Sequence, residues 1–75
     1  MAKTYTTTIK VVNDKGVGVK ANVICSAKDY GYTNDKGLID IEVAEDKKYV
    51  VYAKRNGQTA QVEVKGGGSA TIRFK

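Results

Sequence analysis

Apolar and polar residues alternate with a period of two along almost the whole chain. A strand with one face in a core and the other in solvent produces this alternation, whereas a helix requires spacings of three and four. No segment shows helical spacing over a useful length. We therefore expect an all-β protein that is more than half strand. The alternating series are Tyr5, Thr7, Ile9, Val11; Val19, Ala21, Val23, Cys25, Ala27; Ile39, Ile41, Val43; Ala60, Val62, Val64; and Ala70, Ile72, Phe74.

Two further segments complete the set of expected strands. Residues 49–53 form a continuous apolar run, which is typical of a central strand, and residues 30–33 form a short strand that contains a glycine. The total is about seven antiparallel strands in two sheets, an immunoglobulin-like or transthyretin-like β-sandwich. A chain of 75 residues forms one domain, residues 1–75.

The turns between these strands are marked by asparagine and glycine. The tetrapeptide Asn-Asp-Lys-Gly occurs at residues 13–16 and again at 34–37, and an Asn-Gly turn follows at 56–57. We expect the turns at 13–17, 34–37 and 55–58 to gather at one end of the sandwich. The connections at 27–30, 44–47 and 65–69 should lie at the other end. The first and last strands, residues 5–12 and 69–75, are the expected sheet edges.

Several chemistries lack the residues that they need. The chain has no histidine and one cysteine, which excludes an internal disulfide and a Cys/His zinc site. Cys25 shares the inward positions of its strand, so we expect it to be buried. Asp40 and Glu42 fall on a solvent face and residues 45–46 fall in a turn, so no carboxylate pair converges for acid–base catalysis. We expect no enzymatic activity and no cofactor.

Two loop features resemble ligand sites in composition only. Asp14, Asp35 and Asn56 could converge on a calcium ion, but each is followed by Lys or Gly instead of a further carboxylate. Turn capping is the favoured interpretation, and we expect no metal site. The glycines at 66–68 lack the helix and the Lys-Ser/Thr pair of a phosphate-binding loop, so they are read as a flexible hairpin.

The chain carries a net charge of +5, and its cations are mostly scattered lysines, with only Arg55 and Arg73 as arginines. Solvated faces and protected sheet edges explain this pattern. Nucleic-acid binding is disfavoured, because a stacking platform would interleave exposed aromatics with arginine. We expect no leader sequence, because the first residues show no basic-then-apolar pattern, and no run of about 18 apolar residues is present. A complete gene product of this kind is expected in the cytoplasm or in a virion, and an excised domain at a cell surface.

Three stretches together resemble a known family: VVNDKGVGVKANV (residues 11–23), YTNDKGLI (32–39) and KYVVYA (48–53). They are similar to the carboxypeptidase-regulatory-like and collagen-adhesin B-type (Cna-B) sandwiches, over roughly residues 9–64. The chain has Val17-Gly18 where those families usually have proline. The resemblance implies a non-catalytic sandwich used as a spacer, stalk or binding module. The Lys–Asn amide bond of many adhesin repeats is not expected, because Val11 falls near the lysine position and the last strand has no Asn.

The tyrosines are the candidate binding residues. Tyr30, Tyr32, Tyr49 and Tyr52 cannot all point into so small a core, and exposed tyrosine is a common contact residue. We expect Tyr30, Tyr32 and Tyr52 to contact a partner, with covering of the sheet against water as the other interpretation.

The expected function is a structural or interaction module within a larger assembly, with a virion (capsid) decoration protein as the first candidate. A bacterial cell-wall adhesin domain and a carbohydrate-binding module are the alternatives. The partner is expected to be a protein or an assembly, and the oligomeric state stays open.

Overall fold

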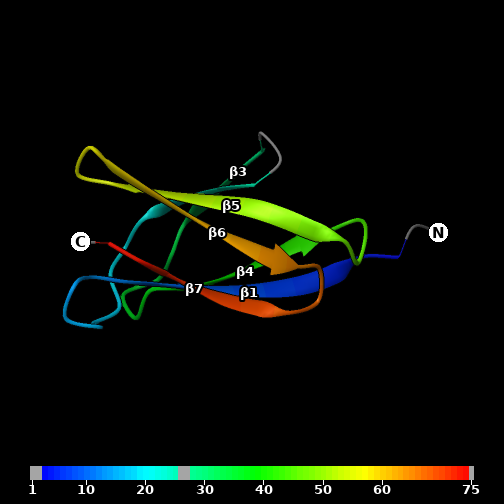
Figure 1. Cartoon of the computed structure of the whole chain (residues 1–75), viewed down its shortest axis with the longest axis horizontal. Helices are drawn as coiled ribbons and strands as arrows, with labels where there is room; N and C mark the ends of the chain where they lie inside the picture. Colours follow the sequence, from blue (N-terminus) through cyan, green and yellow to red (C-terminus); the bar gives the residue numbers. More distant parts are fainter. Residues whose placement is uncertain (1–2, 26–27, 75) are drawn as a thin grey trace.

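The computed structural model describes residues 3–25 and 28–74, and these residues form two packed β-sheets (Figure 1). Strands make up well over half of the described residues and no helix occurs among them, which confirms the all-β expectation. One sheet has the order β4-β1-β7 and the other the order β3-β2-β5-β6. The strands are β1 (Tyr5–Val12), β2 (Asn22–Cys25), β3 (Lys28–Tyr32), β4 (Leu38–Val43), β5 (Lys48–Arg55), β6 (Gln58–Lys65) and β7 (Ser69–Arg73).

Strand β1 is central, which corrects the expectation that it lies at an edge. It pairs antiparallel with β4 and parallel with β7, so that Ile9 lies opposite both Ile39 and Ala70. The parallel β1–β7 pair also corrects the expectation that all the strands are antiparallel, because alternation within a strand carries no information on the direction of its neighbour. Of the threonines that suggested an edge, Thr6 and Thr8 lie on the outward face of this central strand, whereas Thr7 is buried. A sequence does not separate a solvent-exposed face from a solvent-exposed edge, because both favour polar residues that form strands readily. Strand β7 does lie at an edge, as expected.

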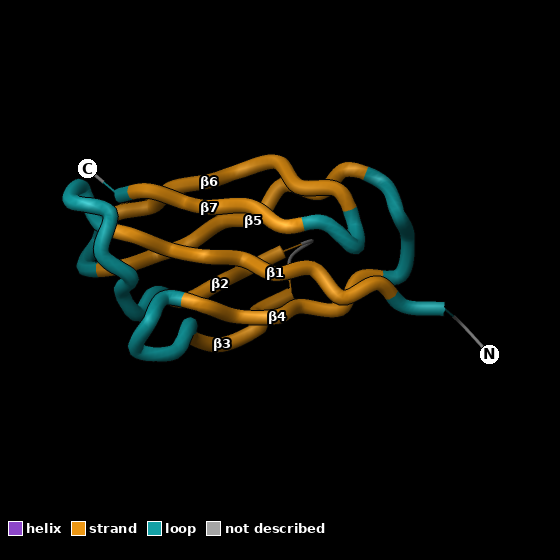
Figure 2. Tube along the Cα trace, turned by 90° about the horizontal axis from the view of Figure 1, so that it is seen from below, coloured by secondary structure: helices purple, strands orange, loops and turns teal. Residues whose placement is uncertain are grey.

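The core lies between the two sheets and contains the inward residues of the alternating series. Cys25 is fully buried among them, as expected. Strand β6 leads directly into β7 and the two lie side by side, which closes one long side of the sandwich (Figure 2). The buried cluster comprises Ile9, Val11, Ala21, Val23, Cys25, Ile41, Val43, Val51, Ala53, Val64, Ile72 and Phe74.

The segment before β2 is held in part by a side chain, in addition to backbone hydrogen bonds. Thr33 is buried, and its Oγ1 accepts a hydrogen bond from the Ala21 amide at 2.9 Å and donates one to the Val19 carbonyl at 2.8 Å. These bonds satisfy backbone groups that a ladder would otherwise pair. The strand therefore begins at Asn22, although the sequence alternation starts at residue 19.

The two Asn-Asp-Lys-Gly turns adopt the same capped conformation. In each turn the asparagine Oδ1 accepts hydrogen bonds from the amides two and four residues later, at 2.9 and 3.0 Å. The closing glycines, Gly16 and Gly37, have φ of +81° and +80°. Both asparagine side chains are thus engaged by the backbone, as the turn-capping interpretation predicts.

The turns gather at the two ends of the sandwich (Figure 1). At one end the 13–17 and 34–37 turns touch, because the Gly18 Cα packs against the backbone at Lys36, and the β5–β6 turn lies at the same end. At the other end the Gly66 amide donates a hydrogen bond to the Lys47 carbonyl at 3.0 Å. The expected grouping of residues 27–30 with this end includes Ala27, which lies outside the described residues.

Candidate interaction face

The five tyrosines divide into a half-buried group and an exposed group. Tyr5, Tyr30 and Tyr49 are half-buried and pack against the core cluster. Tyr32 and Tyr52 are 71% and 40% exposed. Of the three expected contact residues, the structure thus brings Tyr32 and Tyr52 to the surface and directs Tyr30 inward.

A β-bulge in β3 explains why Tyr30 and Tyr32 face opposite ways. Val23 lies opposite Gly31, but Ile24 lies opposite Asp29, so Tyr30 is an extra residue without a partner on β2. Gly31 accommodates the bulge with φ of +92°. Simple alternation places residues two apart on the same face, and one inserted residue reverses that relationship.

Asp29 holds the bulge in place. Its Oδ1 accepts hydrogen bonds from Asn22 Nδ2 at 2.7 Å and from the Gly31 amide at 2.8 Å. These two bonds, that from Asn22 first, lower the pKa of the Asp29 carboxyl from its ordinary value, because they favour the charged form.

Tyr30 closes the long side of the sandwich opposite β6 and β7. Its hydroxyl donates a hydrogen bond to the Glu42 carbonyl at 3.0 Å and so joins β3 to β4. The two strands run next to each other along this side (Figure 2). Burial is the main cause that raises the pKa of this hydroxyl, and the neighbouring Cys25, Tyr49 and Glu42 add to the effect.

A lysine lies over the ring of each half-buried tyrosine. The Lys Nζ to ring-centroid distances are 5.4 Å for Lys3 and Tyr5, 5.0 Å for Lys28 and Tyr30, and 5.6 Å for Lys47 and Tyr49. All three pairs have the spacing Lys-x-Tyr, which places both side chains on the same side of an extended segment. Cation–π contacts at exposed sites contribute about 0.5–1 kcal/mol each. In the sequence, the three half-buried tyrosines share this spacing, and Tyr32 and Tyr52 do not.

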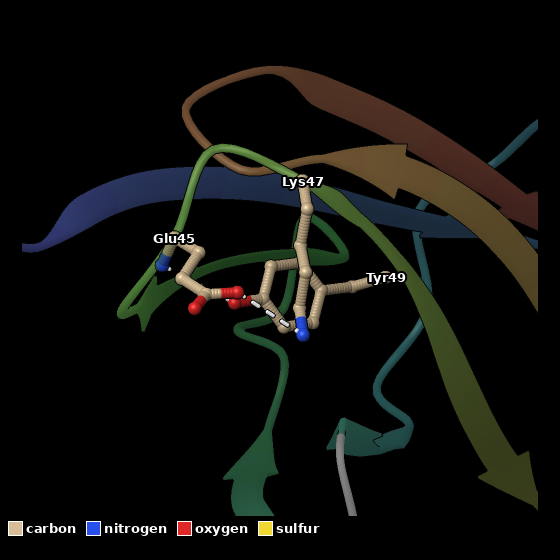
Figure 3. A network of polar contacts seen from close by, with 3 residues as sticks. All are labelled: Glu45, Lys47 and Tyr49. Carbon is tan, nitrogen blue, oxygen red and sulfur yellow. Dashed lines mark hydrogen bonds and ion pairs between the residues drawn. The ribbon is translucent and has the colours of Figure 1, made fainter.

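The polar network around Tyr49 closes the turn between β4 and β5 (Figure 3). Lys47 Nζ lies 3.1 Å from Glu45 Oε2, and the Glu45 amide donates a hydrogen bond to the Tyr49 hydroxyl at 3.2 Å. The hydrogen bond to Glu45 and the charge of that carboxylate raise the pKa of the Lys47 amine. These contacts join residues 45, 47 and 49, so the network stabilises the β4–β5 turn.

The outer face of the β3-β2-β5-β6 sheet carries three of the five large apolar side chains that are exposed in the described residues. Tyr32, Val50 and Tyr52 are 71%, 40% and 40% exposed, and the half-buried Ile24 lies directly opposite Tyr52. We call these four residues, Ile24, Tyr32, Val50 and Tyr52, the tyrosine face. They lie on three neighbouring strands, so their relative positions are set by backbone pairing.

The outer face of the other sheet has a different chemistry. Its outward residues are mainly threonines and charged side chains, with Leu38 as the large apolar member. Thr8 Oγ1 donates a hydrogen bond to Asp40 Oδ1 at 2.8 Å, so these two polar side chains of the face are bonded to each other. The two broad surfaces of the sandwich are therefore unequal, and the tyrosine face is the more suitable for burial against another molecule.

A groove of about 650 Å³ lies at one end of the tyrosine face. Tyr32 forms part of its wall, and the β5–β6 turn, residues 56–57, forms another part. Three cations, Lys20, Lys54 and Arg55, line it, and no carboxylate does. The ion pairs found in residues 3–25 and 28–74 involve Lys47 and Lys48, so none of the groove cations is neutralised by one.

No protein-family model matches the chain, and no curated protein shows a significant match to it. Over residues 3–25 and 28–74, no group of three or more metal-ligating side chains occurs, and no helix is long and apolar enough to cross a membrane.

Proposed function

We propose that the protein is a non-catalytic interaction module that binds a protein partner through the tyrosine face. One observation carries this proposal. Of the five exposed large hydrophobic side chains in the described residues, Tyr32, Val50 and Tyr52 gather on one sheet face. The other two, Val17 and Leu38, lie on a turn and on the opposite sheet.

The composition and rigidity of the face support binding to a protein. Tyrosine provides a large contact area and loses little conformational entropy when it is immobilised. Tyr52 and Val50 lie on β5, which is paired on both sides, so their positions are fixed before the partner arrives. Partner binding also adds to the stability of a domain that is too small to have much in reserve.

The proposed setting is a larger assembly, with the shell of a virion as the first candidate. In the alternative setting the sandwich is one module of a bacterial surface protein. A transthyretin-like or immunoglobulin-like sandwich suits either, and the family resemblance implies this class. The seven strands in sheets of three and four, with β1 parallel to β7, support the assignment.

A double variant, Tyr32→Ser with Tyr52→Ser, tests the proposal against a matched control, Val17→Ser with Leu38→Ser. Both remove two exposed apolar side chains, but only the first changes the tyrosine face. Tyr30 is left intact because its loss would weaken the fold. Circular dichroism and thermal melting verify that each variant is folded.

Binding is measured by biolayer interferometry against the products of the neighbouring genes, shell proteins first. The tyrosine variant should weaken binding by at least about tenfold, as expected for anchor residues, and the control should bind as the wild type does. Equal binding by both variants places the interface elsewhere. Retention on a polysaccharide column that Tyr32→Ser abolishes would instead favour a carbohydrate-binding module.

A further inference from the structure

We propose that the groove beside Tyr32 receives an extended acidic segment of the protein partner, with its carboxylates against Lys20, Lys54 and Arg55. The inference rests on the proposed function, because it specifies the chemistry of the partner that the tyrosine face binds. The groove and the face are continuous, since Tyr32 belongs to both.

The lining of the groove is positively charged. The three groove cations have no acidic neighbour in the lining, so a carboxylate that enters gains attraction without displacing an existing ion pair. The two carboxylates on the same sheet face are already engaged. Asp29 accepts hydrogen bonds from Asn22 and Gly31, and Glu63 lies 3.8 Å from Lys48.

The spacing of the strands provides the second argument. Lys54 and Tyr52 lie two residues apart on β5, on the same outward face, and an extended chain repeats its same-side residues over the same distance, about 6.5–7 Å. A partner segment that lies along β5 with an acidic residue two positions from an apolar residue therefore meets Lys54 and Tyr52 together. Across the face, Asn22 lies opposite Lys54 and Ile24 lies opposite Tyr52, so the polar and apolar rows continue onto β2.

These features favour a protein segment over a nucleic acid or a sulfated polysaccharide. A phosphate or sulfate chain gains little from the apolar Val50 and Ile24 beside the cations. An acidic peptide with apolar residues uses both halves of the surface.

The test uses NMR of the full isotope-labelled chain titrated with a short, N-acetylated peptide of alternating glutamate and leucine. Amide shifts at Asn22, Tyr32, Lys54 and the β5–β6 turn are expected, and added salt should reduce them. A peptide with lysine in place of glutamate should give none. The variant Lys20→Glu with Lys54→Glu should lower the affinity for the glutamate peptide by at least about tenfold. The control Lys10→Glu, on the opposite outer face, should leave its affinity unchanged.

Three results would overturn the inference. The first is no change in amide chemical shift at millimolar peptide, and the second is loss of the changes in Lys10→Glu as well. The third is binding of a heparin oligosaccharide or a single-stranded oligonucleotide at the same amides with higher affinity than the glutamate peptide. The interferometry with the tyrosine variant is independent of this titration. If the tyrosine variant no longer binds the partner and the wild type does not bind the acidic peptide, the proposed function stands and the inference about the groove is wrong.

Discussion

The hydroxyl of Tyr30 donates a hydrogen bond to the carbonyl oxygen of Glu42, 3.0 Å away, and so connects strands that belong to different sheets. On the other long side the chain itself crosses, from β6 to β7. Tyr30 therefore has a structural role on the side where β3 and β4 meet, in contrast to the exposed Tyr32 two residues later.

Removal of this hydroxyl should destabilise the protein without affecting the tyrosine face. Tyr30→Phe loses one hydrogen bond and should lower the free energy of unfolding by about 1 kcal/mol, or Tm by about 4–8 °C in a domain of this size. Tyr32→Phe is the matched control and should leave both unchanged. Urea denaturation measures the difference, and equal stabilities for the two variants would show that the inter-sheet bond contributes nothing.

The two identical turn sequences should respond differently to alanine. Gly16 and Gly37 both have positive φ, but a Cβ on Gly16 would have no atom within 4 Å, whereas one on Gly37 would lie 2.2 Å from the Val11 carbonyl oxygen. Gly16→Ala should cost about 1–2 kcal/mol from the backbone conformation alone. Gly37→Ala adds a backbone clash and should cost at least about 1–3 kcal/mol more. Denaturant midpoints of the two variants measure the difference. Equal losses of unfolding free energy would contradict the close packing of the second turn.

Cys25 should be protected from solvent in the folded protein. Its side chain is fully buried, so a thiol reagent should label the native chain far more slowly than the unfolded chain. Cys25→Ser should cost about 1–3 kcal/mol, because it places a hydroxyl in an apolar site. Labelling of the native protein at the unfolded rate would mean that the register of β2 is wrong.

Asp29 should make stability depend on pH in the acid range. Its folded pKa lies below the ordinary value of 3.8, so its contribution is fully present above that value and is lost as the pH falls through the folded pKa. At neutral pH the wild type should be more stable than Asp29→Asn, and the difference should shrink as the pH falls below 3.8. Urea denaturation across this range provides the measurement. A constant difference would mean that the ionised carboxylate does not stabilise the bulge.

The sequence was sufficient to predict the strands and the capped turns, because alternation and Asn-Gly chemistry are local properties. It placed Cys25 inward for the same reason. The position of β1 between β4 and β7 depends on long-range pairing. The edge prediction for this strand was wrong because it was based on its threonine content. The inward turn of Tyr30 depends on one bulged residue opposite β2, which no local pattern in β3 shows except the glycine at position 31.

The tyrosine face could be predicted only in part. Tyr52 follows from the continuous apolar run on β5, where alternate residues must face outward. The groove was not expected, because Lys20, Lys54 and Arg55 come from segments that are far apart in the chain and meet only through the β2–β5 pairing. Scattered lysines in a sequence give no sign of such a cluster.

The central claim is that the partner covers the tyrosine face, and site-specific photo-crosslinking tests it most directly. A benzophenone amino acid replaces Tyr52 in one variant and Thr8, on the opposite outer face, in the other. Each is irradiated in complex with the partner that binds in the interferometry assay. We predict a covalent adduct from position 52 and none from position 8. An adduct from position 8 alone, or equal adducts from both, would contradict the assignment of the interface.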